Sequence, residues 1–338
     1  MHFDFQLSDT PITSTAGLAF IGQQLSESKF KRHLASICPH QRPGGRISDV
    51  DIAKSMIGLM CVGKPHFHAI SEYHSEPFFG QALGIEKLPS AEILRQRIQA
   101  MPEDAGTTFR DFTTRTLRAH SELLTETIHG VIVVPIHVDV VAMDNSGSNK
   151  EGVSWTYRGF DGYAPAFAYI GSPGLMLNNQ LREGSAHCNC EGTGTWFEQT
   201  LEMAASITDH RRLLVTDAGH DSGKNIRLFD QTPDTDFVIK RNPRKEDPAE
   251  WLALAQKYAK EKDNEQTEEK YFQKLDIGAQ IWYAERELAL PGQTGDDGNP
   301  IKKRVTYRVI DRFADKDTGQ LLTIPKVTIE AYWTSLRS

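Results

Sequence analysis

The first part of the chain carries apolar residues at helical spacing and little of the alternation that marks strands. The clearest segment, DVDIAKSMIGLM, repeats apolar residues every three or four positions between Ser48 and Gly63. Ser is a common N-cap and Gly a common stop, so this spacing predicts a helix. Two more helices are predicted over SEPFFGQALG and over AEILRQRIQAM, which Pro102 closes. Residues 104–128 are expected to continue as helix.

The pattern changes sharply at residue 131. Residues 131–143, VIVVPIHVDVVAM, are rich in Val and Ile with almost no polar interruption. Such a run is typical of a strand buried on both faces, so we expect it at the centre of a sheet. Two further strands are predicted over GYAPAFAYIG and GLMLNNQLREG, which meet at the turn signal Ser172-Pro173-Gly174.

A helix, a strand, a helix and a strand are predicted next. TWFEQTLEMAASITDH is followed by RLLVTDAG, a short buried strand that ends on Asp217, and Ser222 is a suitable N-cap for a helix over GKNIRLF before a strand at 236–242. This order matches the first five strands and first two helices of a ribonuclease-H-like fold, whose first and fourth strands are parallel neighbours. Adjacent strands would bring Asp139 and Asp217 together, although 78 positions separate them.

Beyond residue 243 the pattern predicts one helix and then antiparallel strands. The helix covers PAEWLALAQKYAKEKDNEQTEEKYF, and the strands cover IWYAERELAL, KKRVTYRVIDRF and LLTIPKVTIEAYW. We therefore expect an α/β protein with three regions. These are an N-terminal helical region for DNA binding or dimerisation (1–128), the first part of a ribonuclease-H-like mixed-sheet core (129–243) and an incomplete β-rich insertion region (244–338).

The composition is that of an ordinary globular protein, with 39% hydrophobic and 25% charged residues. The net charge of −7 argues mildly against nucleic-acid binding, although local charge matters more than the sum. No run approaches the roughly 20 apolar residues of a membrane helix, so we expect a cytoplasmic protein. The four cysteines are too few and too unevenly spaced for a disulfide framework, and free thiols fit that reducing compartment.

Two aspartates are candidate metal ligands. Carboxylates at the ends of neighbouring strands are a recognised way to hold Mg²⁺, because a hard cation prefers oxygen ligands. A pair of such ions activates a water and stabilises the leaving oxygen when a phosphodiester breaks. Asp139 and Asp217 are placed for this role. The alternative is that they are turn residues or caps, which strand-end aspartates commonly are.

Several segments carry a family resemblance. ISDVDIAKSMIGLMCVGKPHFHAI, LGIEKLPSAEILRQRI, HVDVVAMDNSGSNKEGVSWTYRGFDGYAPAFAYIG, LREGSAHC, VTDAGHDSGKNI and FVIKRNPR resemble the group-1 DDE transposases of bacterial insertion sequences. The resemblance covers roughly residues 10–245 well and the remainder loosely. It implies a ribonuclease-H-like fold, a homodimer when full length and a nucleoid-associated location. It also implies Mg²⁺, with Mn²⁺ as a substitute, for hydrolysis at the element's terminal inverted repeats and attack of the freed 3′-hydroxyl on target DNA.

By this resemblance Asp139 is the first catalytic carboxylate and Asp217, in the DAG turn, is the second. Asp144 is a rival for the first position. We favour Asp139 because a carboxylate within an apolar strand is costly unless a metal or hydrogen-bond donors compensate it. Asp144-Asn145 is instead typical of an Asx turn.

The family's third acidic residue lies on a helix after the β-rich insertion, in a motif with Tyr, Glu and a following Lys. No such motif occurs before Ser338, and Glu330 sits in strand-like sequence. We therefore expect a truncated chain that lacks the C-terminal part of the core, binds Mg²⁺ weakly and does not complete transposition alone. The alternatives are a stand-alone ribonuclease-H-like nuclease and a non-catalytic DNA-binding remnant that inhibits full-length transposase.

Two clusters are candidate DNA contacts. One lies on the third predicted helix, where Arg and Gln match guanine and adenine edges as in a helix-turn-helix; its members are Arg95, Gln96 and Arg97. The other leaves the last core strand and suits the DNA backbone; its members are Lys240, Arg241, Arg244 and Lys245. The alternatives are a plain helical bundle face, which we favour for the first, and a solvated loop for the second.

Three smaller features allow alternative roles. The HCNC segment (187–190) has zinc-ligand residue types, but a structural zinc site normally needs a second pair of ligands, which is missing from the sequence. Arg182 and Glu183 are compatible with a surface ion pair at a strand end. His220 and Asp221 follow the second carboxylate closely, so they either contact a substrate phosphate or cap the next helix.

Overall fold

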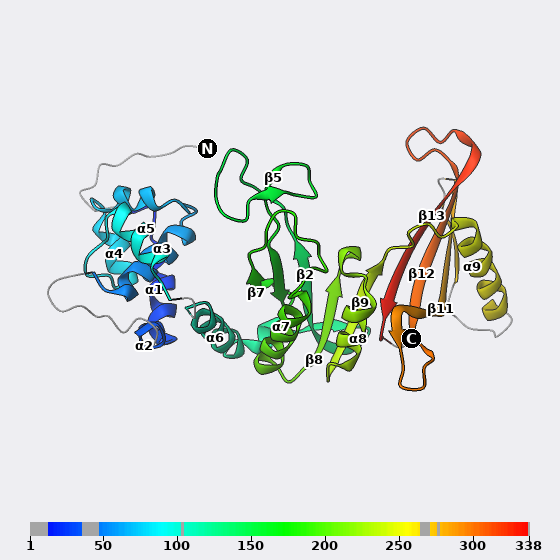
Figure 1. Cartoon of the computed structure of the whole chain (residues 1–338), viewed down its shortest axis with the longest axis horizontal. Coiled ribbons are helices and arrows are strands. Elements are labelled where there is room, and N and C mark those ends of the chain that lie inside the picture. Colours follow the sequence, from blue (N-terminus) through cyan, green and yellow to red (C-terminus); the bar gives the residue numbers. More distant parts are fainter. Residues whose placement is uncertain (1–12, 36–46, 103–104, 264–270, 276–277, 337–338) are drawn as a thin grey trace, which may run out of the picture. The chain divides into compact units, whose positions relative to one another are not determined.

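The computed structural model describes residues 13–35, 47–102, 105–263, 271–275 and 278–336. The chain forms two compact units, one ending at Thr116 and the other beginning at Leu117. Figure 1 shows the chain and labels many of its helices and strands. No helix in the described ranges is both long enough and apolar enough to cross a membrane.

The first unit is built from short helices. They are α1 (Leu18–Glu27), α2 (Phe30–Ala35), α3 (Asp49–Cys61), η1 (Phe67–Tyr73), α4 (Pro77–Leu83), α5 (Ala91–Gln99) and most of α6 (Ala105–Arg118). Ser48 caps α3 by accepting a backbone N–H at 3.0 Å, and Ser90 caps α5 in the same way. The apolar sides of the helices meet in a core that includes Ile52, Phe79 and Leu94. The three predicted helices are confirmed.

The segment after α6 departs from the predicted helix. A 3-10 turn, η2 (Ser121–Leu124), is followed by strand β1 (Glu126–Ile128), which pairs with the start of the next strand. The prediction of helix through residue 128 is therefore wrong at its end. The β-branched residues of TETI disfavour a helix, and the positive φ angles of His129 and Gly130 close a tight hairpin.

The centre of the second unit is a mixed sheet. Strand β2 (Val131–Val140) pairs antiparallel with β6 (Ala166–Ile170), and β6 pairs with β7 (Leu175–Gln180). On its other side β2 runs parallel to β8 (Arg211–Thr216), and β8 runs parallel to β9 (Thr235–Arg241). The central place of β2 and its parallel pairing with β8 are confirmed.

Helices cover one face of this sheet. α7 (Thr193–Ile207) and α8 (Gly223–Gln231) contribute to the apolar core on the face that carries Ile136 of β2 (Figure 1). On the opposite face of β2, His137 and Asp139 are exposed. The prediction that this strand is buried on both faces is therefore wrong for its second half, where residues point alternately to the helices and to solvent.

The sheet continues into the last part of the chain. α9 (Pro248–Asp263) precedes the short strand β10 (Phe272–Leu275) and three long strands, β11 (Ala279–Thr294), β12 (Pro300–Ala314) and β13 (Leu321–Thr334). The predicted antiparallel strands are confirmed. The predicted helix is confirmed through Asp263; its continuation over 264–270 lies outside the described residues, and its predicted last residue, Phe272, begins β10 instead. β13 also pairs antiparallel with β9, so these strands extend the central sheet (Figure 1).

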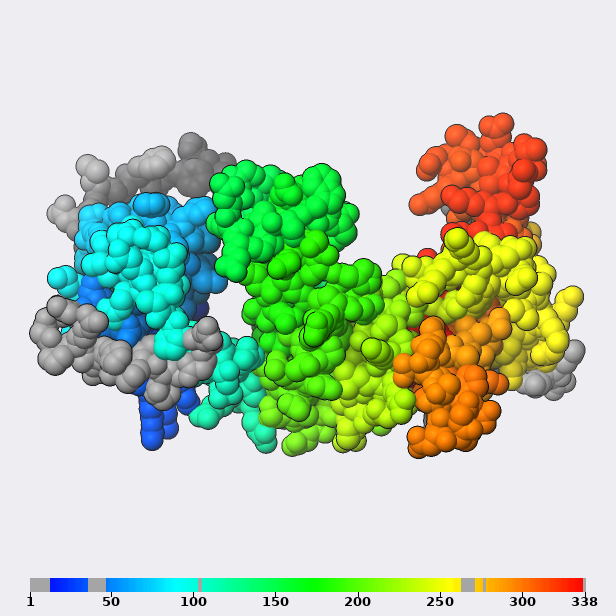
Figure 2. Space-filling view, viewed as in Figure 1, coloured from blue at the N-terminus to red at the C-terminus, as the bar shows by residue number. Residues whose placement is uncertain are grey.

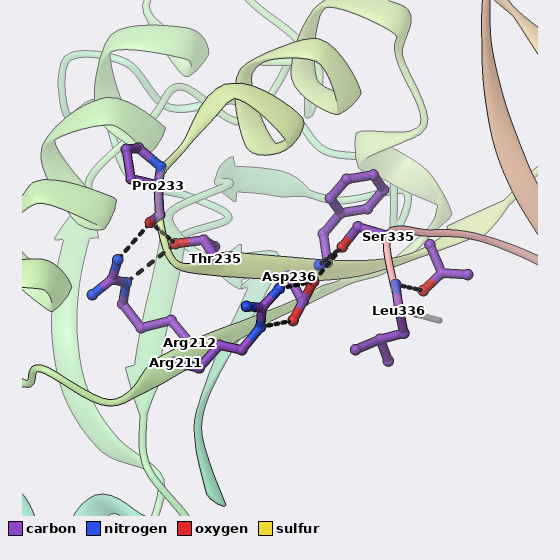
Figure 3. Close-up of polar contacts among 9 residues, drawn as sticks. Arg211, Arg212, Pro233, Thr235, Asp236, Ser335 and Leu336 are labelled. Atoms are coloured by element: carbon purple, nitrogen blue, oxygen red, sulfur yellow. Dashed lines mark hydrogen bonds and ion pairs between the residues drawn. The ribbon is translucent and has the colours of Figure 1, made fainter. Parts of the chain in front are cut away.

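Polar contacts fix the junction between β13 and the parallel strands (Figure 3). Arg211 of β8 forms an ion pair with Asp236 of β9, with Nη2 3.0 Å from Oδ1. Ser335, just after β13, donates from Oγ to Asp236 at 2.9 Å and accepts the Phe237 N–H at 3.0 Å. Ser335 thus joins the end of β13 to β9, and the ion pair joins β9 to β8.

Candidate functional site

Two carboxylates stand at one end of the sheet. Asp139 lies near the end of β2, and Asp217 directly follows β8. Val138 and Thr216 form the last pair between these parallel strands, so the two aspartates occupy the next register position. Neighbouring strands lie about 4.8 Å apart. The fold thus brings both predicted residues to one edge, on the face opposite α7 and α8.

One oxygen of each carboxylate is held by nearby backbone. Asp139 Oδ1 accepts the Val140 N–H at 2.8 Å, and Asp217 Oδ1 accepts the Gly219 N–H at 3.0 Å. Both side chains are exposed, and no hydrogen bond from the described residues engages the second oxygen of either. Available carboxylate oxygens at a solvated edge suit a hard cation that keeps several waters. The donor set therefore fits Mg²⁺.

Asp144, the rival for the first position, lies in a separate small sheet. Its strands are β3 (Met143–Asp144), β5 (Asp161–Tyr163) and β4 (Ser154–Trp155). Asp144 Oδ1 accepts the Ser146 N–H at 2.8 Å, and this bond lowers the pKa of the carboxyl. The predicted Asx turn is confirmed. The burial argument for preferring Asp139 is wrong, because Asp139 is exposed.

His220 is the last residue of the 3-10 turn η3 (Ala218–His220), which follows Asp217. The ring is fully buried and packs edge-on against Phe197, with centroids 5.1 Å apart. Burial, together with the charge of Arg182, lowers the pKa of His220 to about 4. The imidazole is therefore neutral at neutral pH and belongs to the packed side of the sheet. A buried ring does not reach a substrate phosphate on the open face.

Asp221 ties the same turn to the far strands. Its Oδ1 accepts the Trp333 Nε1–H at 2.8 Å, and its Oδ2 accepts the Asn242 N–H at 2.9 Å. The cap of α8 is Ser222, as predicted, with its Oγ accepting the Asn225 N–H at 3.2 Å. Asp221 therefore positions the second carboxylate's turn against β13 rather than capping the helix.

Arg182 is a buried residue at this edge, whereas the sequence suggested a surface position for it. It is 6% exposed, so the proposed surface pair with Glu183 is wrong. Its Nε donates to Gln180 at 2.8 Å, its guanidinium carbon lies 5.4 Å from the Trp196 ring centroid, and burial lowers its pKa. Alternate residues of a strand lie on the same face, so Arg182 shares the face of Asn178, which is buried toward the helices. This alternation is the sequence signal that could have predicted the burial of Arg182.

The HCNC segment (187–190) crosses next to the second carboxylate. Cys188 is partly buried, and burial together with the charge of Asp217 raises the pKa of its thiol. Cys188 and Cys190 are free thiols, as is Cys61, whereas Cys38 lies outside the described residues. Within the described part of the chain, no three or more His, Cys, Asp or Glu side chains gather closely enough to hold a metal ion.

The basic run after β9 divides between two environments. Lys240 is exposed and follows Ile239, the partner of Thr216, so it stands one strand from Asp217 on the open face. Arg241 points to the opposite face, where it pairs with Glu246 and lies over the rings of two tryptophans. Arg244 and Lys245 follow in an exposed loop. Of the four residues in the run, Lys240 therefore stands closest in register to the carboxylates. The run comprises Lys240, Arg241, Arg244 and Lys245.

The α5 candidates belong to the first unit and are engaged there. Arg95 pairs with Glu92 one turn away, and Gln96 donates to the same carboxylate at 2.6 Å. Arg97 pairs with Asp49 at the start of α3. Arg97 therefore joins two helices of the bundle, while Arg95 and Gln96 lie on the exposed side of α5.

Comparison with known proteins gives a distant structural likeness. No family model matches the chain, and no curated protein matches it. The chain is similar to a solved piggyBac transposase synaptic complex with hairpin DNA, with 11% identity and a TM-score of 0.37 over 94% of this chain. It spans 60% of that protein's chain. A likeness this distant carries no argument about activity.

Proposed function

We propose that this chain carries the DNA-cutting core of a DDE transposase of the kind found in bacterial insertion sequences. The observation that carries the proposal is the pair Asp139 and Asp217, at adjacent ends of parallel strands on an open sheet face. The spatial order β7, β6, β2, β8, β9, with the parallel pairs on one side, supports a ribonuclease-H-like core.

The two carboxylates would hold Mg²⁺, or Mn²⁺ in its place, through the oxygens that backbone N–H groups leave available. Such ions, when bound, activate water and stabilise the leaving oxygen of a phosphodiester. The backbone bonds to Oδ1 orient both side chains, so Asp139 and Asp217 are preorganised for a cation. Lys240, one strand away, supplies a positive charge for a phosphate oxygen at the same edge.

We further propose that this two-carboxylate site binds Mg²⁺ weakly. With two protein ligands, most of the coordination shell remains water, and a third carboxylate contributes both charge and rigidity in tighter sites. The partners in this scheme are the inverted repeats of a mobile element and its target DNA, with a second copy of the chain. Cleavage and strand joining by the chain alone are therefore expected to be feeble.

The direct test is Mn²⁺ binding, followed by electron paramagnetic resonance of the free ion. Asp139→Asn and Asp217→Asn should each weaken binding by at least about tenfold, because each removes a charged ligand. Asp144→Asn is the matched control, since this exposed carboxylate is committed to its Asx turn, and it should bind as the native chain does. Unchanged Mn²⁺ binding in the Asp217→Asn variant would overturn the site.

A second measurement separates the alternatives. DNA retention that is equal with EDTA and with Mg²⁺, in both the native chain and Asp217→Asn, would favour a non-catalytic DNA-binding protein. Robust Mg²⁺-dependent cleavage of element-end DNA, abolished by Asp217→Ala, would support the site and contradict the expectation of feeble activity. Cleaved ends without joined products would point to a nuclease that lacks strand transfer.

A further inference from the structure

Residues 141–163 form a small separate layer, here called the arm, directly after β2. The arm contains the three-stranded sheet of β3, β5 and β4. Figure 1 shows it, marked by β5, beyond the ends of β2 and β7, and Figure 2 shows it as a green protrusion of the surface. The proposed cutting chemistry does not use it.

Hydrogen bonds and close backbone packing fix the arm. The Ser185 N–H donates to Ser154 Oγ at 2.9 Å, and the Tyr163 hydroxyl donates to the Glu151 carbonyl at 2.7 Å. A Cβ on Gly184 would stand 2.1 Å from the Ser154 carbonyl oxygen, so glycine is what permits this approach. The arm is therefore a rigid element that presents its side chains in defined positions.

The arm leaves two large aromatic side chains in solvent. Trp155 is 64% exposed and Tyr157 is 63% exposed, whereas Trp196 in the core is 3% exposed. The Arg158 guanidinium carbon lies 5.5 Å from the Tyr157 ring centroid, which places a positive charge beside that ring. Exposed aromatic groups on a rigid element are available to stack on a partner's rings.

Tyr157 stands at the carboxylate edge. The Tyr157 hydroxyl donates to the Val140 carbonyl at 3.1 Å, and the Val140 N–H donates to Asp139 Oδ1 at 2.8 Å. A nucleic-acid strand lying on Asp139 therefore passes within reach of the arm. We propose that the arm binds DNA, with Trp155 and Tyr157 stacking on bases beside the bond to be cut; this rests on the proposed function.

The kind of side chain exposed on the arm favours DNA. The arm's exposed large apolar side chains are the two aromatic rings together with Val141 at 40% and Met143 at 44%, and the rings make up the larger part of that surface. A stable protein interface needs roughly 800 Å² per partner, with polar contacts as well as apolar ones. Isolated rings instead suffice for bases, since every base has a face on which an aromatic ring stacks. The arm carries Lys150 and Arg158 against Asp144, Glu151 and Asp161, so its positive charge is local to the Tyr157 ring, beside which Arg158 lies.

Acrylamide quenching of tryptophan fluorescence tests the proposal without any need for cleavage. The chain has five tryptophans, of which Trp155 is the most exposed. In EDTA, a short duplex with a single-stranded overhang should protect the readily quenched fraction of the emission. Trp155→Phe should abolish that fraction and its protection, while Trp282→Phe should retain both. Trp155→Ala should weaken DNA binding about tenfold, and Leu321→Ala, at an exposed apolar residue outside the arm, should leave it unchanged.

Each outcome bears on the arm separately from the metal site. One possible result is that DNA protects Trp155 from quenching while Asp217→Asn leaves Mn²⁺ binding unchanged. That result would support DNA binding by the arm and overturn the cutting site. DNA binding or cleavage with Trp155 still fully quenchable would overturn the arm alone. Protection that depends on protein concentration and not on DNA would assign the arm to a second copy of the chain and overturn the proposal, as would the absence of any DNA binding.

Discussion

The two faces of β2 differ in burial, although their residues alternate along one strand. Ile136 and Val138 face the helices and are buried, whereas His137 and Asp139 face solvent. On the buried face, removing apolar surface leaves a cavity, so that face sets stability. On the open face a carboxylate stays hydrated and costs the fold little. The sheet therefore separates what holds the protein together from what is available for chemistry.

The largest expected effect comes from neighbouring substitutions on opposite faces of β9. Phe237 is fully buried, and Val238 is partly exposed on the open face. Phe237→Ala should lower the free energy of unfolding by about 3 to 5 kcal/mol through lost burial and a cavity, and Val238→Ala by about 1 kcal/mol or less. Denaturant titration followed by tryptophan fluorescence measures both, because all five tryptophans lie after residue 117.

Similar losses from the two variants would contradict the division between the faces. It would mean that Val238 is covered in solution, and the open face would then be an interface. An unchanged denaturant slope in both variants is the control, since it shows that the two proteins expose the same surface on unfolding.

The buried face of the sheet should also make stability depend on pH, because it carries the buried imidazole of His220. His220 has a pKa lowered from 6.5 to about 4 by burial, so between these values the unfolded chain binds a proton that the folded chain does not. Stability from the neutral ring is therefore fully present above pH 6.5 and is lost as the pH falls toward 4. The shift corresponds to about 3 kcal/mol at most.

His220→Phe should flatten that part of the profile, because Phe keeps the aromatic contact with Phe197 and has no proton to bind. His137→Gln, on the open face of β2, is the matched variant that removes an exposed imidazole. Unfolding free energies measured between pH 4 and 7 decide the matter. An unaltered slope in His220→Phe would assign the acid sensitivity to other groups.

Local sequence patterns predicted where helices and strands form better than they predicted how these elements pack and pair. Caps such as Ser48 and Ser222 are local interactions, and both helices begin where predicted. The exposure of Asp139 was missed because the composition of a strand does not reveal whether a second layer covers it. The pairing of β13 with β9 was also missed, since partners far apart in the chain, such as Ala331 and Arg241, leave no local signal.

The position of the two aspartates in the candidate site could be predicted from the sequence, but the packing around them could not. The strand order that brings Asp139 beside Asp217 follows from the sequence of elements, and the register is confirmed by the Val138 and Thr216 pair. The burial of Arg182 follows from packing against Trp196 on a helix elsewhere in the chain. A strand-end arginine that looks solvated in sequence becomes a core residue only when that helix is in place.

The smallest expected effects come from Lys240 and Arg241, which are adjacent in sequence and lie on opposite faces. Lys240→Gln should weaken DNA binding a few-fold and reduce the salt dependence by about one ion, because one phosphate contact is lost. It should leave stability within about 0.5 kcal/mol. Arg241→Gln should lower stability by about 1 kcal/mol, since this guanidinium packs over Trp251 and Trp333. Salt-titrated DNA binding and denaturant titration of both variants give the comparison. If Lys240→Gln changes stability while Arg241→Gln changes DNA affinity, then the face opposite α7 and α8 is not the one that meets DNA, and the carboxylates on it lose their proposed substrate.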